Sequence, residues 1–367
     1  MDSNTSLQNL HSVLKLSKTL IPQKFIWPKE QNHNTTPNQE EHLNEPIIDL
    51  QAFIDGNHDS ARHTAELVRS ACLSHGLFQV INHGVDSKLI NSMHYHVKDF
   101  FNLPIDEKMR VHRLPGSFWG YSLAHADRFS LNLPWKETIS CFFDENGKGP
   151  DSDFEATGFF KLAFGEDFEE IASIFQKYCE AMKRLSLTIM EILGMSLGAD
   201  QSYFKEFFKD GGSIMRCNLY PPCQEPGLAL GTGPHCDPTA LTILHQDQVG
   251  GLQVLDDGKW KFVKPRHDAF VVSLGDTFVA LSNGVYKSCP HRALVNKSME
   301  RVSLVFFLCP REDKVIVPPE NLVTSERPRK YPDFTWSELL QFTQKHYRVD
   351  IATLQNFTKW LIAHQTT

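Results

Sequence analysis

The chain has 367 residues, 41% of them hydrophobic, so it can bury a sizeable core. Its formal net charge is −7 with acidic and basic residues interspersed, which argues against nucleic acid as a partner because no basic stripe can neutralise a phosphate backbone. The longest largely apolar run, Val302 to Leu308, is far shorter than the ~18 residues that a membrane helix requires, so we expect no membrane association.

The N-terminal region is expected to be mobile. Residues 29–45, KEQNHNTTPNQEEHLNE, contain almost no large apolar groups and cannot offset the entropy of ordering, so we predict a tail over residues 1–45. The first residues, MDSNTSLQNLHSVL, have neither the basic start and apolar run of a secretion signal nor the acid-poor composition of a transit peptide. Together with eight cysteines and no CxxC pair, this predicts a cytoplasmic protein with mostly reduced thiols.

Helices and a strand follow between residues 46 and 205. Apolar residues at helical spacing predict helices over Ser60–His75, Asp86–Phe101 and Phe168–Leu193. Between the first two of these helices, GLFQVINHGV at 76–85 predicts a buried strand that ends in a turn. This region is expected to flank the core that comes next.

After Ile214 the sequence is typical of β-structure. Short apolar runs are separated by Gly, Pro and Asp, and a final helix over about Trp336–His364 is expected to pack back on them. We predict an α+β fold in which a double-stranded β-helix, or jelly roll, occupies 206–315, with helical segments at 46–205 and 316–367. The predicted strands are CNLY, ALTILHQ, GLQVL, KWKFV, AFVVSL, TFVALS, RALVN and VSLVFFL.

Polar residues occur at i, i+2 spacing in three strand-like segments. Side chains two apart in a strand point to the same face, so each pair can point into the barrel. Polar groups that point inward need a partner, and a bound metal with an anionic ligand would provide one. The pairs are Asn218 and Tyr220, His235 and Asp237, and Arg301 and Ser303.

The second pair belongs to a candidate metal site. His235 and Asp237 supply one nitrogen and one oxygen, and His291 can supply a second nitrogen from another strand. Two histidines and a carboxylate form the facial triad of non-haem Fe(II) oxygenases, which leaves coordination positions open for chemistry. Zinc is the competing metal, but catalytic zinc sites usually keep only one position open.

The third pair suggests a dicarboxylate cosubstrate. Arg301 follows His291 by ten residues, and a hairpin turning near Asn296–Ser298 would bring the two side chains together. A 2-oxo diacid could then chelate the metal at one end and lay its distal carboxylate on the guanidinium fork. Ser303 and Tyr220 would add hydroxyl donors.

Two long regions, 46–150 and 214–311, resemble the conserved regions of the plant soluble 2-oxoglutarate dioxygenases, and FQVINHGV resembles the family's N-terminal strand. The resemblance implies an enzyme that uses Fe(II), 2-oxoglutarate and dioxygen, with ascorbate as the reductant. Asn218 is added to the expected cosubstrate contacts because it shares a face with Tyr220. The family's metal and cosubstrate residues fall on His235, Asp237, His291, Arg301, Ser303 and Tyr220.

Within that family the sequence is similar to gibberellin 20-oxidases. The segments that carry this similarity are LPWKET at 133–138, NLYPPCQEP at 218–226 and LGTGPHCDPTALTILHQDQVGGLQV at 230–254. Leu219 and Glu225 depart from the Tyr and Lys of the 20-oxidase pattern, and Pro290 is a less usual neighbour of His291. These departures leave the final product, a nineteen-carbon lactone or a tricarboxylic acid, open.

The LPWKET segment offers candidate substrate contacts. Trp135 could form an apolar wall and Lys136 could pair with a substrate carboxylate, or the segment could be a structural turn. The nearby aromatic residues could line a terpenoid pocket or pack beneath the loop; they are Phe118, Trp119, Tyr121 and Phe129.

The resemblance to gibberellin 20-oxidases implies an enzyme that oxidises a small diterpenoid acid, with successive oxidation at carbon-20 of a gibberellin precursor, and we expect it to be a monomer. The same chemistry on a flavonoid or another hormone precursor is the alternative enzyme. A ligand-binding module without catalysis is a third interpretation, disfavoured because every expected ligand residue is present.

Overall fold

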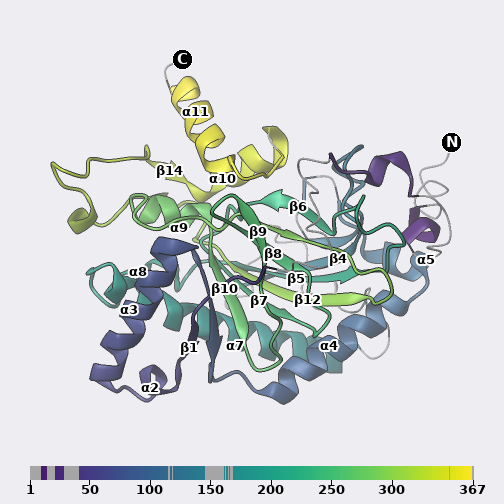
Figure 1. Cartoon of the computed structure of the whole chain (residues 1–367), viewed down its shortest axis with the longest axis horizontal. Coiled ribbons are helices and arrows are strands. Elements are labelled where there is room, and N and C mark those ends of the chain that lie inside the picture. Colours follow the sequence, from purple (N-terminus) through teal and green to yellow (C-terminus); the bar gives the residue numbers. More distant parts are fainter. Residues whose placement is uncertain are drawn as a thin grey trace.

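The computed structural model describes residues 10–14, 21–28, 41–114, 116–117, 119–144, 161, 163, 165, 168–346 and 348–365. Two sheets face each other and form the predicted jelly-roll core, with helices around it (Figure 1). In spatial order, the larger sheet consists of β1 (Ile47–Asp49), β2 (Leu77–Ile81), β10 (Phe270–Leu274), β7 (Leu241–Gln246), β12 (Arg301–Leu308), β5 (Ser213–Tyr220), β4 (Glu137–Phe143) and β3 (Gly120–Leu123). The smaller sheet consists of β6 (Thr232–His235), β11 (His291–Ala293), β8 (Leu252–Asp256) and β9 (Lys259–Phe262).

The larger sheet contains strands from both the predicted flanking region, 46–205, and the predicted jelly-roll region, 206–315. Four of its eight strands, β1 to β4, come from residues before 206. At its centre, β12 pairs antiparallel with β5 on one side and β7 on the other, and all eight of its residues are buried. The apolar run of β12 therefore fills the core, while its first residues, Arg301 and Ser303, bring polar groups inside.

Three long helices pack on this sheet. They are α3 (His58–Ser74), α4 (Ser87–Asn102) and α7 (Phe168–Ser196), which agree with the predicted helices within a few residues. Side-chain caps define two of the starts, because Asn57 accepts from the Ser60 amide and Asp86 from the Lys88 amide. Helix α7 packs on α3 and α4 and contacts β12 (Figure 1).

Among the described residues, no helix is both long enough and apolar enough to cross a bilayer.

The remaining helices, turns and strands of the described chain have 13 residues or fewer. These elements are α2 (Gln51–Ile54), α5 (Ile105–Lys108), α8 (Tyr203–Phe208), α9 (Asp276–Leu281), α10 (Trp336–Gln341), α11 (Thr353–Gln365), the 3-10 turns Gln23–Phe25, Met109–Val111 and Glu320–Leu322, the π-helical turn Phe342–His346, and the pair β13 (Val315–Ile316) and β14 (Phe334–Thr335).

Two predicted elements differ from the structure. The run TFVALS is the helix α9 rather than a strand, and all six residues of α9 are buried. A short run that is apolar on every side carries no period that separates a buried strand from a buried helix. The predicted C-terminal helix is interrupted, since α10 passes into the π-helical turn Phe342–His346 and α11 begins only at Thr353.

The expected mobile tail is also wrong for part of its length. Residues 21–28 and 41–45 pack on the core, where Phe25, Trp27 and Leu43 are buried. Phe25 and Trp27 precede the polar run at 29–45 and Leu43 lies near its end, and burial of these apolar side chains favours an ordered segment. Residues 1–9, 15–20 and 29–40 of the predicted tail lie outside the described residues.

Candidate active site

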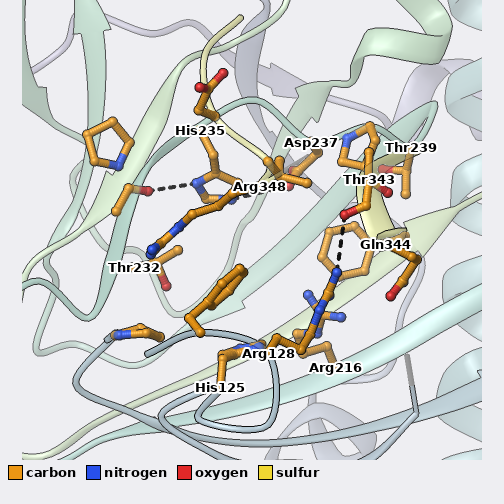
Figure 2. Close-up of a pocket in the computed structure, with 18 of the residues that line it drawn as sticks. His125, Arg128, Arg216, Thr232, His235, Asp237, Thr239, Thr343, Gln344 and Arg348 are labelled. Atoms are coloured by element: carbon orange, nitrogen blue, oxygen red, sulfur yellow. Dashed lines mark hydrogen bonds and ion pairs between the residues drawn. The ribbon is translucent and has the colours of Figure 1, made fainter. Parts of the chain in front are cut away.

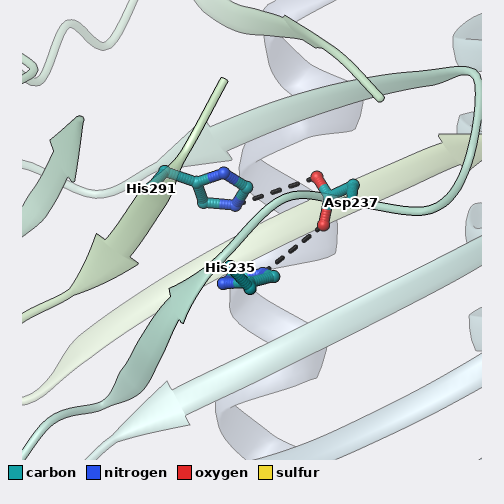
Figure 3. A group of neighbouring side chains, drawn as sticks. All are labelled: His235, Asp237 and His291. Carbon is teal, nitrogen blue, oxygen red and sulfur yellow. Dashed lines mark ion pairs between the residues drawn. The ribbon is translucent and has the colours of Figure 1, made fainter. Parts of the chain in front are cut away.

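Three metal-binding side chains meet where β6 and β11 pair. His235 and His291 are direct partners across the two strands, and their ring centroids are 4.2 Å apart. Asp237 lies just beyond β6, with Oδ1 3.4 Å from His235 Nε2 and Oδ2 3.8 Å from His291 Nε2 (Figure 3). One ligand atom from each of the three residues lies within 4.8 Å of the others. The predicted triad is therefore assembled as a set that one ion could join.

Backbone carbonyls orient both rings. His235 Nδ1 lies 2.9 Å from the Gly233 carbonyl oxygen, and His291 Nδ1 lies 2.9 Å from that of Cys289. If each Nδ1–H donates to its carbonyl, each Nε2 keeps a lone pair for a metal. The donor set, two neutral imidazoles and one carboxylate, fits Fe(II).

The electrostatics favour an ionised Asp237 carboxylate and a neutral His291 ring. Burial opposes ionisation of Asp237, but the nearby His291 ring and hydrogen bonds from His235 and Thr242 outweigh it and hold the Asp237 pKa below its usual range. The Thr242 hydroxyl donates to Asp237 Oδ2 at 2.6 Å. Burial and the charge of His235 lower the pKa of His291. The site is therefore ready to bind a cation near neutral pH.

The Arg301 side chain has the geometry of an anion site. It is 2% exposed, its Nη2 donates to Gln246 Oε1 at 2.9 Å, and its Nε and Nη1 have no hydrogen-bond partner among the described residues. Its guanidinium carbon lies 4.9 Å from the centre of the Tyr220 ring. Buried donors without a partner are costly, so two of them on one guanidinium fit the distal carboxylate of 2-oxoglutarate.

The predicted polar pairs lie side by side on β5 and β12. Arg301 pairs with Tyr220, and Ser303 with Asn218. Asn218 Nδ2 donates to the Ser303 hydroxyl at 3.2 Å, and its Oδ1 accepts from the Thr138 hydroxyl at 3.0 Å. The i, i+2 interpretation thus placed all four residues on one surface.

The predicted route from His291 to Arg301 is wrong. β11 and β12 do not form a hairpin, because β11 belongs to the smaller sheet and β12 to the larger one. The turn itself is present, since Asn296 Oδ1 accepts from the amides of Ser298 and Met299. A turn signal does not specify whether the chain returns to the same sheet or crosses to the facing one.

A cavity of about 330 Å³ opens beside two of the triad residues, His235 and Asp237. Thr232 also lies on its wall, whereas His291 and Arg301 lie outside the lining. Its apolar lining includes Trp27, Phe129, Ile214, Phe307, Trp336 and Leu340. The volume lies within the range of small-molecule sites.

Four basic side chains line the same cavity, and sequence reasoning identified only Lys136. Arg216, on β5, donates from Nε to the Ser140 hydroxyl at 3.0 Å, and its two terminal nitrogens make no hydrogen bond to a described residue. Burial and neighbouring arginines lower its pKa to about 10, which still leaves it charged at neutral pH. Arg128 lies beside it in Figure 2 and donates to the Thr343 carbonyl. Arg348 is the fourth.

Of the two predicted substrate contacts, only Lys136 reaches the cavity. Lys136 lines the cavity, and its Nζ donates to the Thr232 hydroxyl at 3.1 Å. Burial, then the charges of Arg216 and Arg113, lower its pKa well below the usual value. Trp135 does not line the cavity, so its predicted role is wrong: it is 2% exposed and packs edge-to-face on Phe25 at 4.9 Å.

Only one residue of the aromatic stretch is placed on the cavity wall. Phe129 lines it, whereas Tyr121 is buried and donates its hydroxyl to Glu137, and Trp119 is not part of the lining. Phe118 lies outside the described residues. Trp27, Arg128 and Arg348 had no sequence signal beyond their residue type, because the cavity gathers them from distant segments. Arg216 stands two residues before Asn218 on the same strand, but that spacing alone did not identify it.

Two family models match the chain. Residues 211–310 match the 2OG-Fe(II) oxygenase superfamily, and residues 46–159 match the family described as non-haem dioxygenase in morphine synthesis N-terminal. Among solved structures, the chain is similar to JOX2 in complex with 2OG, Fe and JA, with a TM-score of 0.79, 30% identity and coverage of 95% of this chain and 97% of that one. A rice dioxygenase for auxin oxidation has a TM-score of 0.69 and 28% identity, with 85% and 99% covered.

Curated relatives match over nearly the full length. Gibberellin 20 oxidase 2 of Oryza sativa subsp. japonica is 52% identical over 341 residues, which are 93% of this chain and 85% of the relative. Gibberellin 20 oxidase 2 of Arabidopsis thaliana is 48% identical over 361 residues, 98% and 91% of the two chains. The predicted enzyme class is confirmed: the chain belongs to the 2OG-Fe(II) oxygenase superfamily and is a 2-oxoglutarate-dependent dioxygenase.

Proposed function

We propose that this enzyme oxidises a gibberellin precursor at carbon-20, with Fe(II) and 2-oxoglutarate. The observation that carries the proposal is the cavity, in which apolar walls and the basic groups of Arg216 and Lys136 line the same space as His235 and Asp237. A hydrophobic ring system with a carboxylate matches that lining. Relatives about 50% identical that are named gibberellin 20 oxidases support the same substrate.

His235, Asp237 and His291 would hold the iron, and Arg301 would bind the distal carboxylate of 2-oxoglutarate. Tyr220, Ser303 and Asn218 would complete that subsite from the paired strands. When bound, the metal activates dioxygen at the expense of 2-oxoglutarate, which is converted to succinate and carbon dioxide. The part of the protein is to hold the two reactants at the metal and to keep water away from them.

Arg216 and Lys136 would fix the substrate at a point away from the reacting carbon. The terminal nitrogens of Arg216 face no described partner, so a carboxylate could accept from both. Binding energy from a remote group sets orientation without depending on the carbon that is oxidised. That property suits successive oxidation, in which the same carbon must return to the metal as alcohol and as aldehyde.

The test is turnover of purified enzyme with Fe(II), ascorbate, 2-oxoglutarate and a labelled twenty-carbon gibberellin. We expect the carbon-20 alcohol and aldehyde to appear in sequence, with one succinate released per step. Mass spectrometry of the end product decides between the nineteen-carbon lactone and the tricarboxylic acid. Oxidation at a ring carbon, or of a flavonoid in preference, would refute the carbon-20 assignment and leave the dioxygenase class intact.

We also propose that the enzyme is a monomer in the cytoplasm. All eight cysteines are free and seven of them are buried, which suits a reducing compartment. Sedimentation and imaging of a tagged protein test the two statements separately.

A further inference from the structure

The strand that carries His235 is an edge strand. β6 has four residues and pairs only with β11 among the described strands. A short edge strand gains little from its ladder, so its position depends more on its other contacts. One such contact comes from residues 21–28, which precede both regions matched by the family models and pack against β6 through Trp27.

Trp27 makes that contact with Gly233, two residues before His235. A Cβ built on Gly233 would lie 2.1 Å from Trp27 Cη2 and 2.3 Å from Cζ3. Gly233 is not among the residues with a left-handed backbone, so the glycine is required by the space and not by its dihedral angle. The indole thus lies directly against the backbone of β6.

This contact leads to the metal ligand through one hydrogen bond. The Gly233 carbonyl is the group that His235 Nδ1 faces at 2.9 Å. A shift of the Gly233 peptide would therefore turn the His235 ring and move its Nε2. Groups that hold a ligating histidine through its other nitrogen commonly affect metal affinity.

The Trp27 side chain is itself held firmly. It is 6% exposed, its amide donates to the Leu228 carbonyl at 3.0 Å, and its indole Nε1 donates to the Leu133 carbonyl at 3.2 Å. The Leu133 amide in turn donates to the Lys24 carbonyl at 2.8 Å, and Phe25 is fully buried. The segment is therefore docked by backbone and side-chain contacts on two loops.

Arg348 closes the same wall from the C-terminal side. Its guanidinium carbon lies 5.1 Å from the Trp27 ring centre and 4.2 Å from that of Phe129, and it donates to the carbonyls of Leu131 and Asn132. All three of Trp27, Phe129 and Arg348 line the cavity. The cation between two rings joins segments from both ends of the chain.

We propose that Trp27 is a positioning residue for the metal ligand His235, and that residues 21–28 are a working part of the active site. The inference rests on the proposed function only in taking His235 as a metal ligand. It does not depend on which small molecule is oxidised. Its test therefore uses metal affinity, measured without any organic substrate.

The experiment is an anaerobic Fe(II) titration of the full-length, metal-free protein and of four variants. Trp27→Ala is expected to weaken Fe(II) binding about tenfold. Gly233→Ala should be at least as harmful, because the new methyl displaces the indole. The double variant should bind Fe(II) more tightly than Gly233→Ala alone, because the methyl then enters space that the indole has left. Trp360→Ala, which removes a half-buried tryptophan that does not line the cavity, should bind like the wild type.

Circular dichroism and urea unfolding without metal establish that each variant folds, and Trp27→Leu, which keeps an apolar side chain on the docking surface, replaces Trp27→Ala if that variant does not fold. Wild-type affinity in the Trp27 variant would overturn the proposal. Equal harm from Gly233→Ala with and without Trp27 would also overturn it. A wild type that binds Fe(II) but oxidises no gibberellin would refute the proposed function and leave these affinities to decide the inference.

Discussion

The two ends of the active site are built in different ways. At the metal and cosubstrate end, the side chains stand on paired strands: His235 faces His291 across β6 and β11, and Arg301 faces Tyr220 across β12 and β5. At the substrate end, the lining combines strand residues such as Arg216 with residues from loops and turns, including Trp27, Phe129 and the segment around Arg348. Strand register fixes the metal and cosubstrate residues, whereas part of the substrate lining comes from loops, which vary more readily between related enzymes.

Loss of any one metal ligand should have the largest effect. His235→Ala, Asp237→Ala or His291→Ala should each abolish turnover, because a facial triad has no redundant ligand. Iron content and succinate release are the measurements, with circular dichroism to show that the chain still folds. An exposed histidine, His112, gives the matched control His112→Ala, which should keep both. Near-normal iron and activity in any triad variant would show that the metal site is misassigned.

Arg301→Lys should weaken the binding of 2-oxoglutarate and leave the binding of the gibberellin nearly unchanged. A lysine ammonium cannot reproduce the guanidinium fork, and loss of a charge-assisted hydrogen bond costs about 1.5–3 kcal/mol, or roughly ten- to a hundredfold. The KM for 2-oxoglutarate should rise by that factor while the KM for the gibberellin changes little. Steady-state kinetics with each reactant varied in turn measures both. Equal increases would mean that Arg301 shapes the whole cavity.

Arg216→Gln should have the opposite pattern. The KM for the gibberellin should rise about tenfold, because Lys136 and Arg128 remain to attract the carboxylate, and the KM for 2-oxoglutarate should stay unchanged. The methyl ester of the substrate sharpens the test: the wild type should prefer the free acid, and the variant should lose most of that preference. The exposed Arg311 supplies the control Arg311→Gln. An unchanged preference would remove Arg216 from the carboxylate site.

A smaller effect, on the pH dependence of stability, concerns buried histidines around strand β7. β7 carries Gln246, which supports Arg301, and His245, whose Nδ1 lies 2.8 Å from His94 Nε2 on α4. Burial and the charge of His245 lower the pKa of His94 to about 3 and that of His83 to about 4. The unfolded chain binds protons on these rings below pH ~6.5, where the folded chain does not, so their contribution to stability is present above that pH and is lost as the pH falls toward 4.

Urea unfolding at pH 7.5, 6.0 and 5.0 measures this effect. The free energy of unfolding should decrease as the pH is lowered, by at most about 1.4 kcal/mol per pH unit for each ring. His94→Gln removes one proton site and relieves the histidine pair, so its slope should be shallower. A slope that His94→Gln leaves unchanged would assign the acid sensitivity to other groups.

The same division explains what could be predicted from the sequence. His235 with Asp237, and Arg301 with Ser303, were identifiable because a strand puts i and i+2 on one face and because their residue types suit a metal and a diacid. The triad and the jelly roll follow from such local patterns.

The substrate end could not be predicted in this way. Trp135 and Trp27 are both tryptophans near loops, and only tertiary packing places Trp135 in the core and Trp27 on the cavity. Arg216 follows the i, i+2 pattern with Asn218, but neither its residue type nor the spacing shows that its terminal nitrogens would lack a protein partner. The helix α9 was missed because a fully buried run has no visible period.

The most direct measurement is a crystal structure of the enzyme with Mn(II) in place of iron, 2-oxoglutarate and a twenty-carbon gibberellin. We predict the metal on His235, Asp237 and His291, the distal carboxylate of 2-oxoglutarate on Arg301, and the gibberellin carboxylate on Arg216 with carbon-20 toward the metal. A gibberellin bound with carbon-20 away from the metal, or with its carboxylate on Arg301, would contradict this prediction.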